Sequence, residues 1–299
     1  MATTLHALDA VSLPRRRRRQ RGWLARHQGA ILRHSVIILF LLIILLPLAW
    51  VLLMSFKTLP DAMRGVFWPS HFDFTHYPFV FSKIKTLPVN LFNSIYVTTG
   101  TVLITSVCAV FGGYALVHLR PGGAAFVTAA LLMSLYFPVR VVSLISVYEI
   151  QSFLGLINST SGLILPYITL NLAISVLIMR SMFQLVPHEL FEAAKIDGAG
   201  PWRSLWMIGL PMVRNGLVVI FIVNFVTAWG EYLLCVTLTN DQDTRTMPVV
   251  LAAAQGGQGY WAWPNLAAVY VIVVLPGIIA FSFAQKLFFK GLAEGVVKG

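Results

Sequence analysis

The chain has 299 residues, of which 58% are hydrophobic and only 11% are charged. No soluble domain of this length needs so large an apolar fraction for its core, so the composition excludes an ordinary soluble protein and predicts a polytopic membrane protein. The formal net charge of +11 would suit nucleic-acid binding, but the excess of Lys and Arg lies in the N-terminal tail and in short segments beside apolar runs. Membrane topology and contact with anionic lipid headgroups explain it more simply, and no nucleic-acid partner is expected.

Apolar runs of about 18 residues or more can cross a hydrocarbon layer of ~30 Å as helices, which satisfy their own backbone hydrogen bonds. The sequence has six such candidates. The prediction is an all-α membrane protein with transmembrane helices near 35–56, 90–117, 124–148, 162–183, 207–238 and 264–286.

The N-terminal segment 1–34 is strongly basic and contains "RRRRRQR" before the first apolar run. The run is too long for a secretory signal and lacks a small-x-small cleavage site, so we expect a retained first helix. Under the positive-inside rule, the distribution of Lys and Arg places both termini in the cytoplasm. The predicted organisation is a basic tail (1–34), a transmembrane domain (35–290) and a cytoplasmic C-terminal tail (291–299).

Segment 57–89 would then be the longest external connection before the second span, and its "FWPSHFDFTHYPFVF" alternates aromatics with His, Pro and Asp. Aromatic rings suit the membrane interface, where apolar and wet surroundings meet. The segment is either a structural cap or a contact for an external partner.

Arg140 is unusual because it falls inside the third predicted span, where an unpaired cation costs at least about 2.5 kcal/mol. It can snorkel to the outer headgroups, pair with Glu231 near the outer part of the fifth span, or line a translocation path. In the last case a fixed guanidinium would favour an anionic sugar, because its fork geometry matches a carboxylate.

The stretch "FEAAKIDGAGPWRSLWMIGLP", residues 191–211, is charged and interrupted by glycines between two apolar runs. Segment 185–211 predicts two short helices around a turn at Asp197-Gly198, with Pro201 starting the second helix. Pro211 should kink that helix as it enters the membrane. The hairpin either fits a groove on a partner protein or rests on lipid.

The external segment 239–265 ends in a glycine-rich, aromatic tip. The tip is either a flexible probe with stacking rings or, with Trp261 and Trp263, a belt anchor for the last helix. Cys108 and Cys235 lie inside predicted spans without a second Cys or a His nearby, which favours buried apolar thiols and no metal site. The sequence shows no Walker-type phosphate loop and no HExxH, CxxC or GxSxG motif.

The pattern E192-A193-A194-x-x-D197-G198-A199, followed by I208-x-L210-P211, resembles the EAA loop of permease subunits of bacterial ATP-binding-cassette importers. Leu205 stands where that family usually has Phe. The resemblance implies a type I importer permease fold in which the loop docks into a cleft of the ATPase. The implied ATPase-coupling residues are Glu192, Ala193, Ala194, Asp197, Gly198 and Ala199.

Further stretches resemble the carbohydrate branch of these importers, the maltose-type permeases: "LFNSIYVTTGTVL", "GLINSTSGLILPY", "AWGEYLL" and the ending "KGLAEGVVKG". Gly230 replaces the Asn that the family often has before the Glu, and it should loosen the helix there. The resemblance implies that the C-terminal tail also touches the ATPase, through Gly291, Leu292, Lys298 and Gly299. It likewise implies an external loop that contacts the binding protein, formed by Gln255, Gly256, Gly257, Gln258, Gly259 and Tyr260.

The mechanism implied is alternating access driven by ATP, in a multi-pass protein of the bacterial inner membrane that performs no chemistry itself. The implied partners are a second, homologous permease, two ATP-binding subunits and an extracytoplasmic solute-binding protein. ATP and magnesium would bind to the ATPase, and this chain itself would hold no cofactor. The cargo would be a carbohydrate, with Arg140 and Glu231 as candidate residues of the translocation path, and an anionic oligouronate such as alginate fits if Arg140 lines that path. The rival hypotheses are an ion-coupled secondary transporter and a membrane enzyme.

Overall fold

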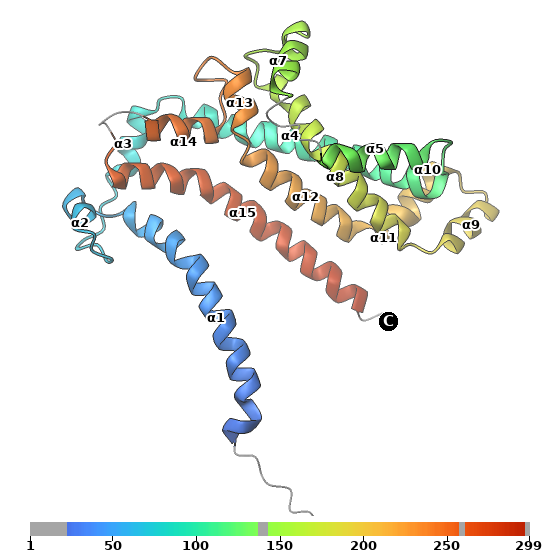
Figure 1. The fold of residues 1–299 in the computed structure, drawn as a ribbon, viewed down its shortest axis with the longest axis horizontal. Helices are drawn as coiled ribbons and strands as arrows, with labels where there is room; N and C mark the ends of the chain where they lie inside the picture. The colour runs from blue at the N-terminus through green and yellow to red at the C-terminus, as the bar shows by residue number, and fades with distance from the viewer. Residues whose placement is uncertain (1–22, 137–142, 257–260, 297–299) are drawn as a thin grey trace, which may run out of the picture. The chain divides into compact units, whose positions relative to one another are not determined.

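The computed structural model describes residues 23–136, 143–256 and 261–296. Figure 1 shows these residues as helices joined by short connections, with no strand among them. The chain divides into two compact units, Met1–Trp50 and Val51–Gly299. The all-α prediction is therefore confirmed.

Helix α1 (Trp23–Met54) supplies the described part of the first unit and continues into the second. Its portion Leu32–Met54 is long and apolar enough to cross a membrane. The large side chains from Val36 to Leu46 are exposed on all sides of the helix. Such a surface is stable when it is surrounded by lipid, which agrees with a membrane helix.

The segment between α1 and the next long helix folds into a cap that contains α2 (Leu59–Arg64) and α3 (His76–Lys83). Lys57 is fully buried and donates a hydrogen bond from Nζ to the carbonyl oxygen of Val66 at 2.6 Å. Asp61 accepts hydrogen bonds at Oδ2 from the hydroxyl and the amide of Ser70, at 2.6 and 2.9 Å. Polar contacts therefore fix the cap, while Trp68 and its neighbouring aromatics stay exposed.

The centre of the second unit is the pair α4 (Leu87–Tyr114) and α8 (Ile164–Gln184). A π-helical turn, η1 (Ala115–Leu119), extends α4, and a 3-10 turn, η2 (Ser161–Leu163), precedes α8. Gly113 allows the close approach, because a Cβ there would lie 2.8 Å from the backbone nitrogen of Arg180. Both helices meet the length and composition of a membrane span.

The third predicted span, 124–148, is not seen as one helix. Helix α5 (Ala124–Tyr136) covers its first part and α7 (Leu144–Phe153) begins near its end, while residues 137–142 lie outside the described part of the chain. The other five predicted spans have counterparts. Within the described residues, four helices are long and apolar enough to cross a membrane, and one bent pair of helices has the length and composition of a fifth span if its two parts are counted together.

The last part of the chain contains α12 (Arg214–Trp229), α13 (Leu233–Leu238), α14 (Met247–Gly256) and α15 (Trp263–Val296). Helix α15 runs alongside α12 in Figure 1, and the indole nitrogen of Trp229 donates to the carbonyl oxygen of Val273 at 3.2 Å. A hydrophobic cluster that includes Val80, Met247 and Val269 joins α3, α14 and α15. The cap and the segment 239–265 therefore pack at the same end of this unit.

Candidate functional site

The predicted hairpin is present. Helix α9 spans His188–Ile196 and α10 spans Pro201–Ser204, so the prediction of two short helices around a turn is confirmed. Gly198 makes the turn with φ of +78°, a left-handed conformation that side chains disfavour. The amide of Ala199 then donates to the carbonyl oxygen of Ala194 at 2.8 Å, which closes the C-terminal turn of α9.

One side of α9 packs against the rest of the chain. The ring of Phe191 lies 3.9 Å, centroid to centroid, from that of His118, and both rings approach Phe183 or Tyr114 in the same cluster. Ala194 is buried, with only 9% of its surface exposed. Ala194 is therefore a packing residue, which corrects the expectation that both alanines of the motif face a partner.

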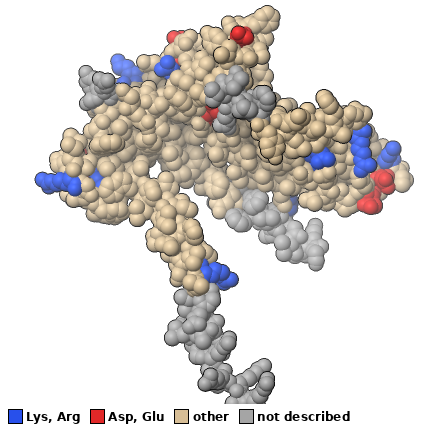
Figure 2. Space-filling model, viewed as in Figure 1, with Lys and Arg blue, Asp and Glu red and all other residues tan. Residues whose placement is uncertain are grey.

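The other side of α9 is free in this chain. Glu192, Ala193, Asp197 and Gly198 are exposed, and Ala199 is half-buried. Ile196 is 86% exposed, although nothing in its sequence context marked it as a surface residue. Figure 2 shows basic and acidic side chains together at the α9 end of the molecule. The surface thus combines an acid, a small residue and an apolar side chain, which suits a protein groove better than a lipid surface.

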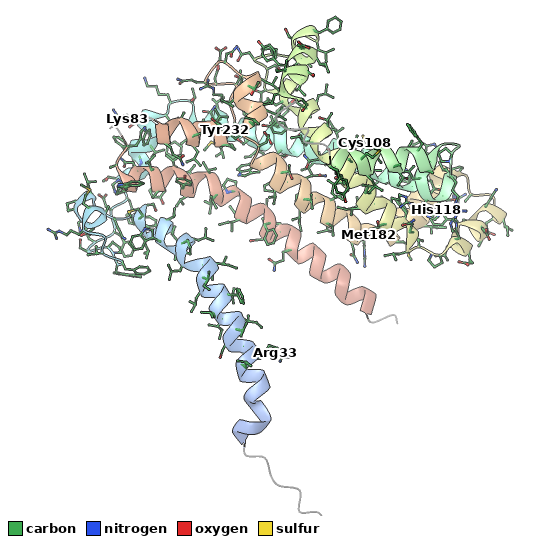
Figure 3. The ribbon with its side chains drawn as sticks, viewed as in Figure 1. Arg33, Lys83, Cys108, His118, Met182 and Tyr232 are labelled. Atoms are coloured by element: carbon green, nitrogen blue, oxygen red, sulfur yellow. The ribbon has the colours of Figure 1, made fainter. Side chains whose placement is uncertain are left out.

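The hairpin is tied to the end of α4. Tyr114 donates a hydrogen bond from its hydroxyl to the carbonyl oxygen of Pro201 at 3.2 Å. Arg120 Nη2 lies 2.7 Å from His188 Nε2, and the ring of Trp202 lies 5.3 Å from that of Phe111. Figure 3 places His118 between α8 and the hairpin, consistent with these contacts. A displacement of α9 would therefore act on α4 as well as on the following span.

The fifth predicted span, 207–238, is bent, as expected from Pro211. The segment Pro201–Met212 meets Arg214–Trp229 at 75°. A π-helical turn, η3 (Leu205–Gly209), and the short α11 (Leu210–Met212) precede the break at Val213. Proline lacks a backbone N–H and clashes with the preceding turn, which explains the bend at this place.

Glu231 lies at a second break of the fifth span, between α12 and α13. The side chain is buried, and its Oε1 accepts the amide of Leu234 at 3.0 Å, so it caps α13. Gly230 ends α12, which agrees with the expected loosening of the helix. Glu231 also lines a cavity of about 530 Å³ together with Ser143 and Tyr232. Of these residues, Figure 3 labels Tyr232, near α13. Arg140 lies outside the described residues, so its pairing with Glu231 and its place on a path stay predictions.

The first two residues of the predicted binding-protein contact loop are helical. Gln255 and Gly256 form the end of α14, and Gln255 Nε2 donates to the hydroxyl of Tyr270. The segment before α14 is also fixed, because Asn90 and Asn93 donate to its carbonyl oxygens at 2.6 Å each. The remaining predicted contact residues, Gly257, Gln258, Gly259 and Tyr260, lie outside the described part of the chain.

At the C-terminus, Gly291 and Leu292 belong to α15, which continues to Val296 instead of ending near 286. Lys298 and Gly299 lie outside the described residues. Cys235 is buried as expected, whereas Cys108 is exposed, and neither thiol is in a disulfide. In the described segments, no three His, Cys, Asp or Glu side chains come together as a metal site would require.

Comparison with known proteins agrees with the family that the hairpin sequence resembles. Residues 22–294 match the model of the family described as "Binding-protein-dependent transport system inner membrane component". The chain is 30% identical over 271 residues to the diacetylchitobiose uptake system permease protein NgcG of Streptomyces coelicolor, covering 90% of this chain and 89% of that protein. It is 32% identical to the sulfoquinovosyl glycerol transport system permease protein SmoH of Agrobacterium fabrum, covering 85% and 89%.

A solved structure shares the fold. It is the crystal structure of a bacterial ABC transporter involved in the import of the acidic polysaccharide alginate, with a TM-score of 0.77 and 21% sequence identity. The match covers 88% of this chain and 98% of that chain. The expected type I importer permease fold is thereby confirmed.

Proposed function

The chain belongs to the family of binding-protein-dependent transport system inner membrane components, and from this premise we propose that it is the carbohydrate permease subunit of an ATP-driven importer. The observation that carries the proposal is the α9 hairpin. One face of α9 packs through Phe191 against His118 of η1, the extension of α4, while Glu192, Ala193 and Ile196 are exposed on the other face. This arrangement is what a transmitting element needs: a rigid attachment inside and a docking face outside.

In the proposed cycle, two ATP-binding partner subunits close on ATP and move the hairpin. The displacement of the hairpin would be transmitted to α4 through the hydrogen bond between Tyr114 and Pro201, and to α12 through the bent segment. A second, homologous permease would complete the path, and two discrete arrangements of the pair would give alternating access. ATP and magnesium would bind to the ATPase, and this chain would carry no catalytic group. Both termini would lie in the cytoplasm of a bacterial cell.

The carbohydrate cargo rests on the relatives, whose names specify sugars or sugar conjugates. Glu231 and the hydroxyl-bearing residues around its cavity offer hydrogen-bond acceptors and donors of the kind that bind sugars. An anionic oligouronate would need Arg140 on the path as the compensating charge. Competition in vesicles between neutral maltodextrins and oligouronates tests this point. If both sugars compete equally, and Arg140→Ala changes neither result, the hypothesis of an anionic cargo is wrong.

Copurification tests the docking face. An ATPase subunit should copurify with the wild-type chain, and it should no longer copurify when Glu192→Lys reverses the charge at this position of α9. Glu149→Lys is the matched control, because Glu149 is an exposed acid on α7, outside the hairpin. Retention of the ATPase by Glu192→Lys, or its equal loss in the control, would contradict the role of α9.

The rival function is an ion-coupled secondary transporter, which places ionisable groups deep in several spans. Glu231 is the buried acid that would suit it, but its Oε1 is used to cap α13. Uptake driven by a proton gradient without ATP would support the rival.

A further inference from the structure

A small cavity lined by cations lies at the end of the second unit where the cap meets the segment 239–265. Its volume is about 340 Å³. The basic lining residues are Lys83, which ends α3, Lys85, which follows it, and Arg245, which precedes α14. Trp261 and the alanines at the end of α14 form another part of the wall, and no acidic residue of the described chain lines it. Figure 2 shows basic side chains at the upper left of the view, in the region where Figure 3 labels Lys83.

These cations form no ion pair within the described residues. The ion pair found there joins His76 and Asp73, and it involves none of the three. Lys83 Nζ lies 5.6 Å from the ring centroid of Phe79, a weak cation–π contact. Arg245 donates through Nη2 to the carbonyl oxygen of Asn240 at 3.2 Å, but its Nε is buried without a hydrogen-bond acceptor. A buried donor without an acceptor is costly, so the site is suited to a ligand that supplies one.

The cavity is held in shape before any ligand arrives. Asn90 Nδ2 donates to the carbonyl oxygens of Gln242 and Arg245, at 2.6 and 2.9 Å. Ser94 Oγ accepts the amide of Met247 at 2.8 Å, directly after the loop. Because α4 fixes the backbone on both sides of Arg245, the guanidinium can bind without first ordering a loop, which lowers the cost of binding.

The position of the cavity indicates what fills it. All of its lining residues lie outside the candidate membrane spans Leu87–Leu119 and Trp263–Phe283 that flank it. With a cytoplasmic N-terminus, this end of the unit is external, where Lys and Arg are scarce. The positive-inside rule therefore does not explain these cations. They sit beside α14, next to the tip predicted to contact a solute-binding protein.

We infer that this cationic cavity is a docking site for a carboxylate side chain on the surface of the solute-binding protein. The inference rests on the proposed function and adds a specific contact to it. An acidic side chain fits because a carboxylate can accept from the Arg245 fork while the two lysines neutralise its charge. Such complementary charge steers a soluble partner to its receptor and fixes its orientation.

The test uses the complete complex in nanodiscs and the solute-binding protein that stimulates its ATP hydrolysis. The quantity measured is the binding-protein concentration that gives half-maximal stimulation. In Lys83→Gln/Lys85→Gln we expect it to rise about threefold to tenfold, with a weaker dependence on salt, because exposed charges are screened by ions. Both lysine side chains are exposed, so the variant should fold normally. Arg245→Lys keeps the charge but loses the fork, and should show a smaller rise.

Arg64→Gln is the matched control, since Arg64 is an exposed cation of the cap outside the cavity. It should change the half-maximal concentration by less than about twofold. Equal values in the wild type and the lysine variant would overturn the inference, as would an equal rise in Arg64→Gln.

Two further arms identify other occupants. If the difference between wild type and variant disappears in nanodiscs of neutral lipid, the cavity binds a lipid headgroup and the inference is wrong. If it appears only when the binding protein carries an anionic sugar, the cavity binds cargo and the inference is again wrong. If no binding protein stimulates the wild-type complex, the proposed function fails and this contact fails with it.

Discussion

The turn of the hairpin offers a sharp test, because Gly198 after α9 and Gly200 at the N-cap of α10 have equally open surroundings but different backbone conformations. An added Cβ would meet no atom within 4 Å at either Gly198 or Gly200. Gly198 has φ of +78°, whereas Gly200 has φ of −70° and ψ of 168°. Alanine at both positions therefore isolates the cost of the left-handed backbone from any cost of crowding.

The magnitude follows from that geometry. A non-glycine residue in the left-handed region costs roughly 1–2 kcal/mol, which should weaken the closed turn about 5-fold or more in Gly198→Ala. Gly200→Ala should be neutral or stabilising by up to ~1 kcal/mol, because alanine reduces the freedom of the unfolded chain without straining the folded one. The amide most affected is that of Ala199, which donates to Ala194 across the turn.

Hydrogen exchange measured by mass spectrometry over residues 188–204 of the purified complex gives the readout. We expect faster exchange in Gly198→Ala by about 5-fold, with a matching loss of coupling between ATP hydrolysis and uptake, and no acceleration in Gly200→Ala. Equal exchange in the two variants would refute the claim that this turn is held by the conformation of Gly198.

Three other changes test separate parts of the structure. Gly113→Ala would place a Cβ 2.8 Å from the backbone of Arg180, so we expect α4 and α8 to separate. Thermal unfolding should then show a loss of stability of about 1–3 kcal/mol. Gly122→Ala, at a position in open space, should leave the stability unchanged. Ile196→Asp should abolish ATPase association without lowering the melting temperature, because the side chain is 86% exposed; a lower melting temperature would assign Ile196 to packing instead. Hydrogen bonds from the hydroxyl and amide of Ser70 hold the pKa of Asp61 below its usual value, so its stabilising contribution is present above about pH 3.9 and is lost as pH falls through the lower folded pKa. Asp61→Asn should remove that part of the acid sensitivity in thermal unfolding followed from pH 6 downward, and an unchanged pH profile would contradict it.

Local sequence signals predicted the parts of this fold that depend on local physics. The turn at Gly198, the start of α10 at Pro201 and the bend near Pro211 each follow from the backbone properties of one residue. The apolar runs predicted most spans for the same reason, since the bilayer selects composition and length.

Long-range packing decided the features that the sequence did not reveal. Ala194 is buried because Phe191 turns that side of α9 towards α4, and helix periodicity alone does not say which side faces the protein. Helix α14 was expected as loop because its ten residues are too few for a span. The cationic cavity joins residues more than a hundred positions apart, Lys83 and Arg245, through contacts that no local pattern encodes.

Uptake of labelled oligosaccharide into vesicles that contain the complete complex tests the central claim most directly. With the binding protein outside, we predict uptake only when ATP is enclosed on the side of the nucleotide-binding subunits. We also predict that uptake is lost in Glu192→Lys. Uptake that follows an imposed proton gradient in the absence of ATP, and that is unaffected by Glu192→Lys, would contradict the account.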